Sequence, residues 1–337
     1  MGNKISLIST VLRHPRRVAK MLNLVKGTRL YITAVIGEVL DPFLSSLDTA
    51  EKAQSITTLI ERHGIANPSL FKDMLSLLQE EGYLKRSEDD KIWLATPLSQ
   101  DMFEAIKPKI ASEVLDAFEP FYKQGKQASK ERLAGIPPSD FDADELRVLW
   151  TVALKGDFYR MQRDQAFKFA QIAKFLKQRS SPLHVLDFGC GSGDGTVQLY
   201  KFLEKKRVNA EIEACDPAEG LLEVARDDAM EFPLYFFNST RTSPKTAYYD
   251  AIFSCQVFHW EPNPTKLIGV LKTYLKPNGI LFGVQSYNSP RLRPIDLFIR
   301  IMGAQGFPPL GELHKWFSKN DLKLDYHTQF YAFKAQP

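Results

Sequence analysis

The sequence is poor in cysteine and lacks long apolar runs. Its 337 residues include only three cysteines, Cys190, Cys215 and Cys255. An odd number of widely separated cysteines excludes a disulfide framework and indicates a reducing compartment, so we expect a cytoplasmic protein. No stretch of about 20 apolar residues is present, which argues against a helix that crosses a membrane. The cysteines fall on predicted strands or beside one, where small buried hydrophobic side chains are common.

Metal-binding patterns are missing too. The sequence contains neither H-E-x-x-H nor C-x-x-C, and its carboxylates do not cluster beside histidines, so no metal site is expected. The overall charge is modest, with 44 Lys and Arg against 40 Asp and Glu, a net charge of +4. The hydrophobic content of 44% is that of a globular chain, and this length accommodates one large domain or two ordinary ones.

The positive charge gathers at the amino terminus. Residues 1–37 contain seven Lys or Arg and no acid, interleaved with apolar side chains. Such an arm can lie on an anionic membrane surface, can target an organelle, or can pack as a helix across a dimer. We favour dimer packing and keep peripheral membrane contact through residues 1–30 as a second hypothesis. The first six residues also match the N-myristoylation pattern, which is short enough to occur by chance.

The most specific motif lies in the middle of the chain. A predicted strand over residues 184–187 ends at Asp187, and a loop with glycine at every second position leads into a predicted helix. Glycines at such a turn allow positive φ and the close approach of a ligand. A dinucleotide-binding fold requires G-x-G-x-x-G, but Asp194 stands where the third glycine of that pattern belongs. The loop glycines are Gly189, Gly191, Gly193 and Gly195.

An acid at a strand end followed by G-x-G-x-G resembles the first motif of the class I S-adenosylmethionine-dependent methyltransferases. From residue 181 to the end, predicted strands alternate with helices, as a doubly wound sheet requires. We therefore expect an α/β protein in which residues 166–337 form a Rossmann-like methyltransferase domain. The resemblance implies S-adenosyl-L-methionine as the cofactor, with Asp187 and the loop glycines Gly189, Gly191 and Gly193 at its site.

Further cofactor-binding candidates follow the next strands. Asp216 ends the second predicted strand, 25 residues after Gly191, where an acid can bind both ribose hydroxyls. The alternative is a helix N-cap, because Pro217 follows and opens a predicted helix. The resemblance places Asn238, after the third strand, at the adenine ring, although relatives often carry Asp there. It also assigns cofactor contacts to Pro217 and to the backbone of Gly189, Ser254 and Cys255.

The first part of the chain has a winged-helix pattern. A predicted helix over residues 70–78 ends near Gly82, and two short strands follow at 83–86 and 91–95. This pattern resembles the N-terminal domain of dimeric small-molecule O-methyltransferases, which implies a mainly helical domain over residues 1–105 and a homodimer. The predicted wing tip is acidic and the second helix carries only Lys72, which argues against nucleic-acid binding.

Linker helices over residues 106–165 are expected to contribute to a substrate pocket. The resemblance suggests that Phe158 and Met161 line it, with ordinary helix packing as the alternative interpretation. The substrate-binding candidates are Trp150, Phe158, Met161, Gln256 and Trp260.

His259 is the candidate catalytic base. It follows the fourth predicted strand, and an imidazole with a pKa near ~6.5 can accept a phenolic or carboxylic proton. Its alternative role is to line the pocket. We expect methyl transfer to a small, apolar or aromatic hydroxyl-bearing molecule, with O-methylation as the first hypothesis and C- or N-methylation as alternatives. A membrane-surface enzyme acting on a lipid or quinone, and a non-catalytic regulatory module that binds the cofactor, are the other hypotheses.

Overall fold

The computed structural model describes residues 15–137 and 155–336, which fall into two compact units. The sheet unit contains residues 15–17, 155–288 and 307–336, and the helical unit contains residues 18–137 and 289–306. The helical unit therefore combines residues from the first part of the chain with a short segment, residues 289–306, from its last part. Each unit has its own core and is considered by itself.

The helical unit contains the expected winged helix. Its three-stranded sheet has the order β1-β3-β2, and every pair of neighbouring strands is antiparallel. In the chain, β1 comes before α3 and α4, and β2 and β3 come after them. The side chain of Ser55 caps α3, and that of Asn67 caps α4 ahead of Pro68, so local sequence signals start both helices. The elements are α2 (Pro15–Leu44), β1 (Gln54–Ser55), α3 (Ile56–His63), α4 (Pro68–Glu80), β2 (Leu84–Arg86) and β3 (Lys91–Leu94).

The described part of the basic arm belongs to α2. From Tyr31 onward most of its apolar side chains are buried in the helical unit, and Arg29 pairs with Glu80 and Glu81 at the end of α4. Residues 1–14 lie outside the described residues, so membrane contact through residues 1–30 and packing across a dimer remain predictions. Within the described ranges, no helix is both long and apolar enough to cross a membrane.

The remaining helices of this unit come from two separate stretches of the chain. Helix α14 follows the last parallel strand of the other unit in sequence, yet it packs against α4 and α7, and Arg300 on it pairs with Asp73. Its buried Leu297 and Ile301 explain this placement, because they need an apolar partner. Helices α6 and α7 of the expected linker also belong here. The bounds are α5 (Met102–Ile106), α6 (Ser112–Phe118), α7 (Tyr122–Leu133) and α14 (Arg293–Ile301).

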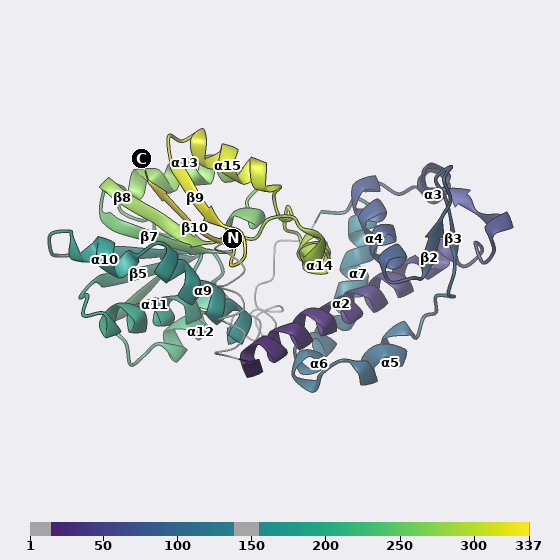
Figure 1. The fold of residues 1–337 in the computed structure, drawn as a ribbon, viewed down its shortest axis with the longest axis horizontal. Helices are drawn as coiled ribbons and strands as arrows, with labels where there is room; N and C mark the ends of the chain where they lie inside the picture. The colour runs from purple at the N-terminus through teal and green to yellow at the C-terminus, as the bar shows by residue number, and fades with distance from the viewer. Residues whose placement is uncertain (1–14, 138–154, 337) are drawn as a thin grey trace. The chain divides into compact units, whose positions relative to one another are not determined.

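The sheet unit is the expected Rossmann-like domain. Seven strands follow the order β6-β5-β4-β7-β8-β10-β9, in which β4 to β8 are parallel to one another and β10 is antiparallel to both of its neighbours. Figure 1 shows α13 and α15 on one face and α9, α10, α11 and α12 on the other. The strands are β4 (His184–Phe188), β5 (Glu211–Asp216), β6 (Leu234–Asn238), β7 (Tyr249–Cys255), β8 (Leu275–Val284), β9 (Lys323–His327) and β10 (Ala332–Gln336). The helices are α9 (Asp157–Phe169), α10 (Ile172–Lys177), α11 (Asp194–Lys205), α12 (Glu219–Asp228), α13 (Pro264–Tyr274) and α15 (Leu310–Ser318).

One strand lies elsewhere than the sequence pattern indicates. The alternating segment that ends the chain predicts an edge strand, but β10 is inserted between β8 and β9 and pairs antiparallel with both. The edge position is occupied by β9 instead. Phe333 and Ala335 are buried against the core on one face of the sheet, and alternation reports only this covered face, so it does not distinguish a central strand from an edge strand.

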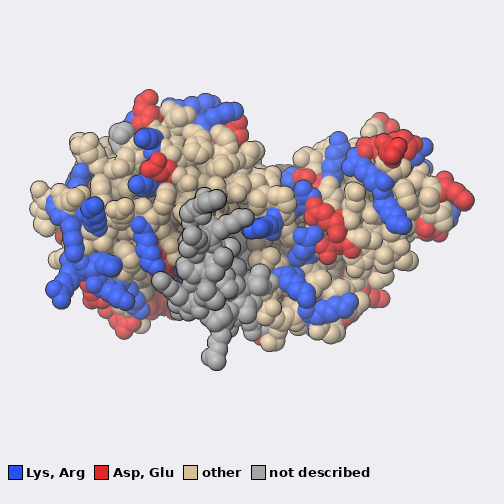
Figure 2. All heavy atoms as spheres, in the orientation of Figure 1, with Lys and Arg blue, Asp and Glu red and all other residues tan. Residues whose placement is uncertain are grey.

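Charged side chains also gather on the sheet unit. Figure 2 shows Lys and Arg over the region of α10 and α11. The exposed basic residues of these two helices and of the turn after α11 are Lys174, Lys177, Lys201, Lys205, Lys206 and Arg207. Those at the carboxyl end of α11 complement the helix dipole, so a stabilising role accounts for them without a ligand.

We predict that Phe167→Ala destabilises the sheet unit by about 3–5 kcal/mol, because it removes a fully buried ring. Phe167 packs between α9 and the sheet, with its ring centroid 5.3 Å from that of Phe253 and 5.2 Å from that of Phe202. Denaturant unfolding measures the change. Tyr235→Ala is the control, since Tyr235 is 61% exposed and its loss is expected to cost less than about 0.5 kcal/mol. Equal effects of the two substitutions would contradict this core.

Candidate functional site

The glycine loop lies at the carboxyl edge of the sheet, between the end of β4 and the start of α11. Because β4 is flanked by β5 on one side and β7 on the other, this is the point where the strand order reverses, which is where doubly wound folds bind ligands. Gly189 has φ of 75°, and a Cβ there would lie 2.3 Å from the side chain of Val257. Gly193 has φ of 78°, and a Cβ there would lie 2.9 Å from the Cβ of Ala225. The loop therefore requires glycine at both positions for conformation and space.

Asp216 connects this loop to the next strand. Its Oδ2 accepts a hydrogen bond from the Gly191 amide at 2.9 Å, and its Oδ1 accepts one from the Ala218 amide at 2.9 Å. Helix α12 begins at Glu219, so Pro217 precedes the helix rather than opening it. An ionised carboxylate has about four acceptor sites. Two stay available for ribose hydroxyls, so the predicted ribose contact is compatible with the local bonding role.

Asp187 is buried at the end of β4 with only half of its carboxyl group paired. Thr196 donates to Oδ2 at 2.7 Å, whereas Oδ1 has no partner among the residues the structure describes. Burial raises the pKa of Asp187 to about 7, and the hydrogen bond from Thr196 and the charge of Arg163 oppose the shift. The hydroxyl of Ser254, at the end of β7, is likewise buried and unpartnered. Orphaned polar atoms beside a glycine loop fit a polar ligand that supplies the missing bonds.

Asn238 lies where it was predicted, at the end of β6, but its side chain is fully engaged. Its amide nitrogen donates to the Pro217 carbonyl at 3.1 Å and to Glu219 at 2.9 Å. Its oxygen accepts from both the amide and the hydroxyl of Thr240. All four hydrogen-bonding positions of this side chain are thus used within the protein, and its contact with adenine stays a prediction.

His259 sits in a short 3-10 turn after β7, and only 4% of it is exposed. Gln285 Oε1 accepts from the Phe258 amide, which orients its Nε2 toward the Ser286 carbonyl at 2.9 Å and His259 Nδ1 at 3.3 Å. This network assigns Nδ1 as an acceptor and places the ring proton on Nε2. Burial lowers the pKa of His259 to about 3, and the Gln285 bond opposes that shift. With Nδ1 engaged by Gln285 and its pKa lowered, this imidazole is a weak base, and the general-base role of His259 stays a prediction.

Gln256 holds the ends of β7 and β8 together. Its Nε2 donates to the Ser286 hydroxyl at 2.7 Å, and its Oε1 accepts from the Ser286 amide at 3.0 Å. Its backbone has φ of 60°, which is rare for a residue with a side chain and is typical of functional sites. Burial raises the pKa of the neighbouring Cys255 thiol to about 12, so this side chain is not a nucleophile.

The other substrate candidates are only partly placed. Trp150 lies outside the described residues, and Phe158 is in the first turn of α9, without a described side chain. Met161 packs against a buried cluster that contains Ala166 and Val284, which agrees with the packing interpretation. Trp260 is half-buried, with its ring 5.4 Å from that of His259. Of the substrate-binding candidates, Trp260 and Gln256 thus lie near His259.

Two residues of the site escaped the sequence analysis. Gln285 orients His259. Arg163 on α9 donates a hydrogen bond to Gln198 at 2.7 Å, and its positive charge lowers the pKa of Asp187. Gln285 directly follows the fifth strand, a position that could have indicated it because strand ends meet at the site. Nothing in the sequence near Arg163 indicates its approach to Asp187.

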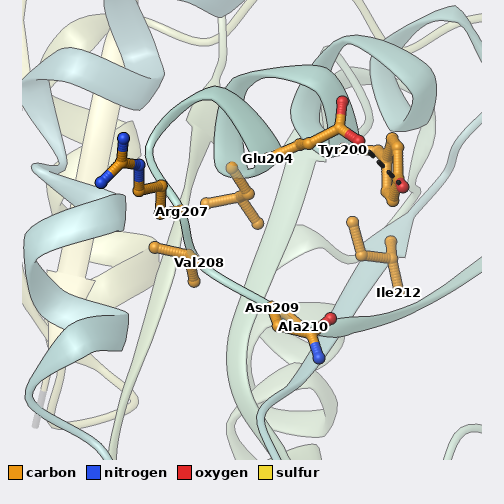
Figure 3. Close-up of a pocket in the computed structure, with 8 residues that line it drawn as sticks. Tyr200, Glu204, Arg207, Val208, Asn209, Ala210 and Ile212 are labelled. Atoms are coloured by element: carbon orange, nitrogen blue, oxygen red, sulfur yellow. Dashed lines mark hydrogen bonds between the residues drawn. The ribbon is translucent and has the colours of Figure 1, made fainter.

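Two further features of the described residues bear on this region: their potential metal ligands and a surface hollow. The described residues contain no group of three or more His, Cys, Asp or Glu that could hold a metal ion. A hollow lined by Tyr200, Glu204, Arg207 and Asn209 opens beside the start of β5, where Tyr200 bonds to Glu204 at 3.5 Å (Figure 3). It lies at the amino edge of the sheet, opposite the glycine loop, so it does not serve the cofactor.

The fold and this site define a class I methyltransferase domain. Residues 159–329, about half of the chain, match the family model described as "methyltransferase domain", and the chain belongs to this family. It is an S-adenosylmethionine-dependent methyltransferase, and S-adenosylmethionine is its cofactor.

Several known proteins are similar to this chain. The malonyl-(acyl-carrier protein) O-methyltransferase of Halalkalibacterium halodurans is 32% identical over 129 residues, which are 36% of this chain and 46% of that protein. The chain spans less than half the length of the curated relatives it matches. The CurJ carbon methyltransferase structure is 13% identical, with a TM-score of 0.66 over 99% of this chain and 96% of its own. The O-methyltransferase family 2 protein of Planctomyces limnophilus, solved with apigenin, is 18% identical, with a TM-score of 0.54 over 96% and 97%. These two structures show the fold alone.

Asp216→Ala is expected to lower the affinity for S-adenosylhomocysteine, the product form of the cofactor, by at least about tenfold, because a charge-assisted pair of ribose contacts is lost. Isothermal titration measures it. Asp227→Ala on the exposed side of α12 is the matched control and should bind normally. Unchanged affinity in Asp216→Ala would refute the ribose assignment.

The pH dependence of stability tests the state of His259. Its pKa is about 6.5 when exposed and about 3 in the fold. The unfolded chain therefore takes up the proton first, and the native state loses stability as pH falls from about 6.5 toward 3. Unfolding free energies of wild type and His259→Gln, measured across this range, should show a wild-type advantage that shrinks toward acid pH. A difference that does not vary with pH would contradict a buried neutral imidazole.

Proposed function

We propose that the chain transfers a methyl group to an oxygen that is already ionised at neutral pH, and that a carboxylate on a small acceptor is the simplest such group. The carrying observation is the state of His259, whose depressed pKa and occupied Nδ1 leave it unsuited to remove a proton. A carboxylate has a pKa near ~4 and requires no base, whereas a phenol near ~10 does.

The chain's own residues suit this acceptor. S-adenosylmethionine supplies an activated methyl group, so the protein has to align the nucleophile and exclude water. The Nε2–H of His259 can donate to an anionic oxygen, and the Gln285 bond keeps the ring in that tautomer. Trp260 and Phe307 pack around the imidazole and keep water from it, and the ring centroid of Phe307 is 5.0 Å away.

The comparison by sequence supports an oxygen acceptor. The relative from Halalkalibacterium halodurans is named for methylating malonyl-(acyl-carrier protein), and a malonyl group carries a free carboxylate. An acyl chain in thioester linkage is therefore the acceptor class that we favour. The hydroxyl-bearing aromatic acceptor that the sequence suggests becomes the second candidate, since it would need a base other than His259.

Carbon methylation is the alternative reaction. It would require removal of a C–H proton before transfer, and the imidazole at the site is a weak base because burial disfavours its charged form. The homodimer, and a lipid or quinone acceptor at a membrane surface, remain hypotheses from the sequence.

A direct assay separates these reactions. The purified protein is incubated with S-adenosylmethionine and, in turn, a dicarboxylic acyl thioester, a fatty acid, a phenol and a β-ketoacyl thioester. We expect a mass gain of one methylene on a carboxylate acceptor and release of methanol on mild alkaline treatment, which marks an ester. A methyl group that resists alkali would overturn the proposal, in favour of ether formation when the acceptor is the phenol and of carbon transfer when it is the β-ketoacyl thioester.

The rate should be nearly independent of pH between about 6 and 8 with a carboxylate acceptor, because neither the acceptor nor His259 titrates there. Saturating cofactor removes the effect that Asp187, whose pKa is about 7, has on cofactor binding. His259→Gln should retain this flat profile, since an amide can still donate a hydrogen bond to the acceptor. Its KM should rise, because the amide replaces the positioned Nε2–H of the imidazole. The profile of kcat is measured for both proteins. A wild-type rate that falls below a pKa near ~6.5, with the fall lost in His259→Gln, would restore the general-base role.

A further inference from the structure

Gln162 is the most unusual buried residue of α9. Only 1% of it is exposed, and neither its Oε1 nor its Nε2 has a hydrogen-bonding partner in the part of the chain that the structure describes. A buried carboxamide with both ends unpaired is costly, and buried polar groups in native proteins are otherwise paired with protein, water or ligand. Gln162 therefore has the properties of a group that completes its bonds when a ligand binds.

The packing of α9 places Gln162 beside the cofactor crevice. Ala166, one turn further along the helix, packs in a buried cluster with Val284 at the end of β8, and Cys255 at the end of β7 packs against that cluster. Tyr159, three residues before Gln162, interacts electrostatically with Cys255. Residues three and four apart share a helix face, so Gln162 lies between these two contacts on the face turned to the strand ends.

The next residue strengthens this placement. Arg163 lies against the start of α11, where its Cδ is 3.5 Å from the point that a Cβ on Gly195 would occupy. Its positive charge lowers the pKa of both Asp187 and Cys255. The first half of α9 thus approaches the glycine loop and the end of β7 together. Ser254 and Asp187 hold the other orphaned polar atoms of this edge.

We propose that the Gln162 carboxamide binds the amino-acid end of S-adenosylmethionine and positions the cofactor along β7. A carboxamide can accept from an ammonium and donate to a carboxylate, and the α-amino acid group of the cofactor offers both charges at once. The adenosine portion offers no such pair. The proposal deepens the methyltransferase function and rests on it, because it concerns the same cofactor site.

Two ligands distinguish the amino-acid end from the rest of the cofactor. S-adenosylhomocysteine contains it, and 5′-methylthioadenosine lacks it. For Gln162→Leu we expect affinity for S-adenosylhomocysteine to fall by at least about tenfold in isothermal titration, while affinity for 5′-methylthioadenosine stays unchanged. Gln162→Met, which keeps the length of the side chain, should behave alike. Gln165→Leu, a half-buried position on the same helix, is the matched control and should bind both ligands as wild type does.

Thermal unfolding without ligand provides the second measurement. Removal of an unpaired buried amide should leave the melting temperature of Gln162→Leu equal to or above that of wild type, while the rise produced by S-adenosylhomocysteine becomes smaller. Equal loss of affinity for both ligands, or a lower melting temperature with unchanged binding, would overturn the proposal in favour of a structural role. Unchanged binding with a raised KM for the acceptor would assign Gln162 to the substrate and overturn it as well. Failure of wild type to bind either ligand would instead refute the cofactor site itself.

Discussion

The attachment of the glycine loop to the end of β5 is the constraint on which the site depends. The Gly189 and Cys190 amides donate to the Cys215 carbonyl at 2.8 and 3.0 Å, and Asp216 accepts from the Gly191 amide. These bonds hold a loop of positive-φ glycines in one shape between two parallel strands. Asp216 also receives the Ala218 amide, so a single carboxylate sets the loop and the approach to α12 before any ligand binds.

The two edges of the sheet treat buried polar groups differently. At the amino edge, Asp250 is buried and fully paired, with Arg179, Lys276 and the His184 amide as its partners. At the carboxyl edge, atoms of Asp187, Ser254 and Gln162 have no partner among the described residues. The same fold therefore satisfies a buried charge where only stability matters and leaves hydrogen bonds open where a ligand binds.

Burial also determines the chemistry at His259. The ring is enclosed by Phe307 and Trp260, and desolvation disfavours its charged form. A histidine after the fourth strand suggests a base when only its type and place are known. Its surroundings instead favour a neutral imidazole that donates a hydrogen bond, which is the basis of the proposed ionised acceptor. The burial that keeps water from the ring also weakens it as a base.

The class of fold, the winged helix, the glycine loop and the place of Asp216 at a strand end follow from local signals in the sequence, namely hydrophobic period, helix caps and glycine spacing. Other features emerge only in the folded chain: the insertion of β10 beside β8, the membership of α14 in the helical unit, the internal bonding of Asn238 and the unpaired amide of Gln162. Each of these depends on which side chains meet across the fold. Contacts between residues far apart in the chain produce no periodic pattern in the sequence. The burial that shifts a pKa or leaves an amide without a hydrogen-bonding partner exists only after the chain has folded.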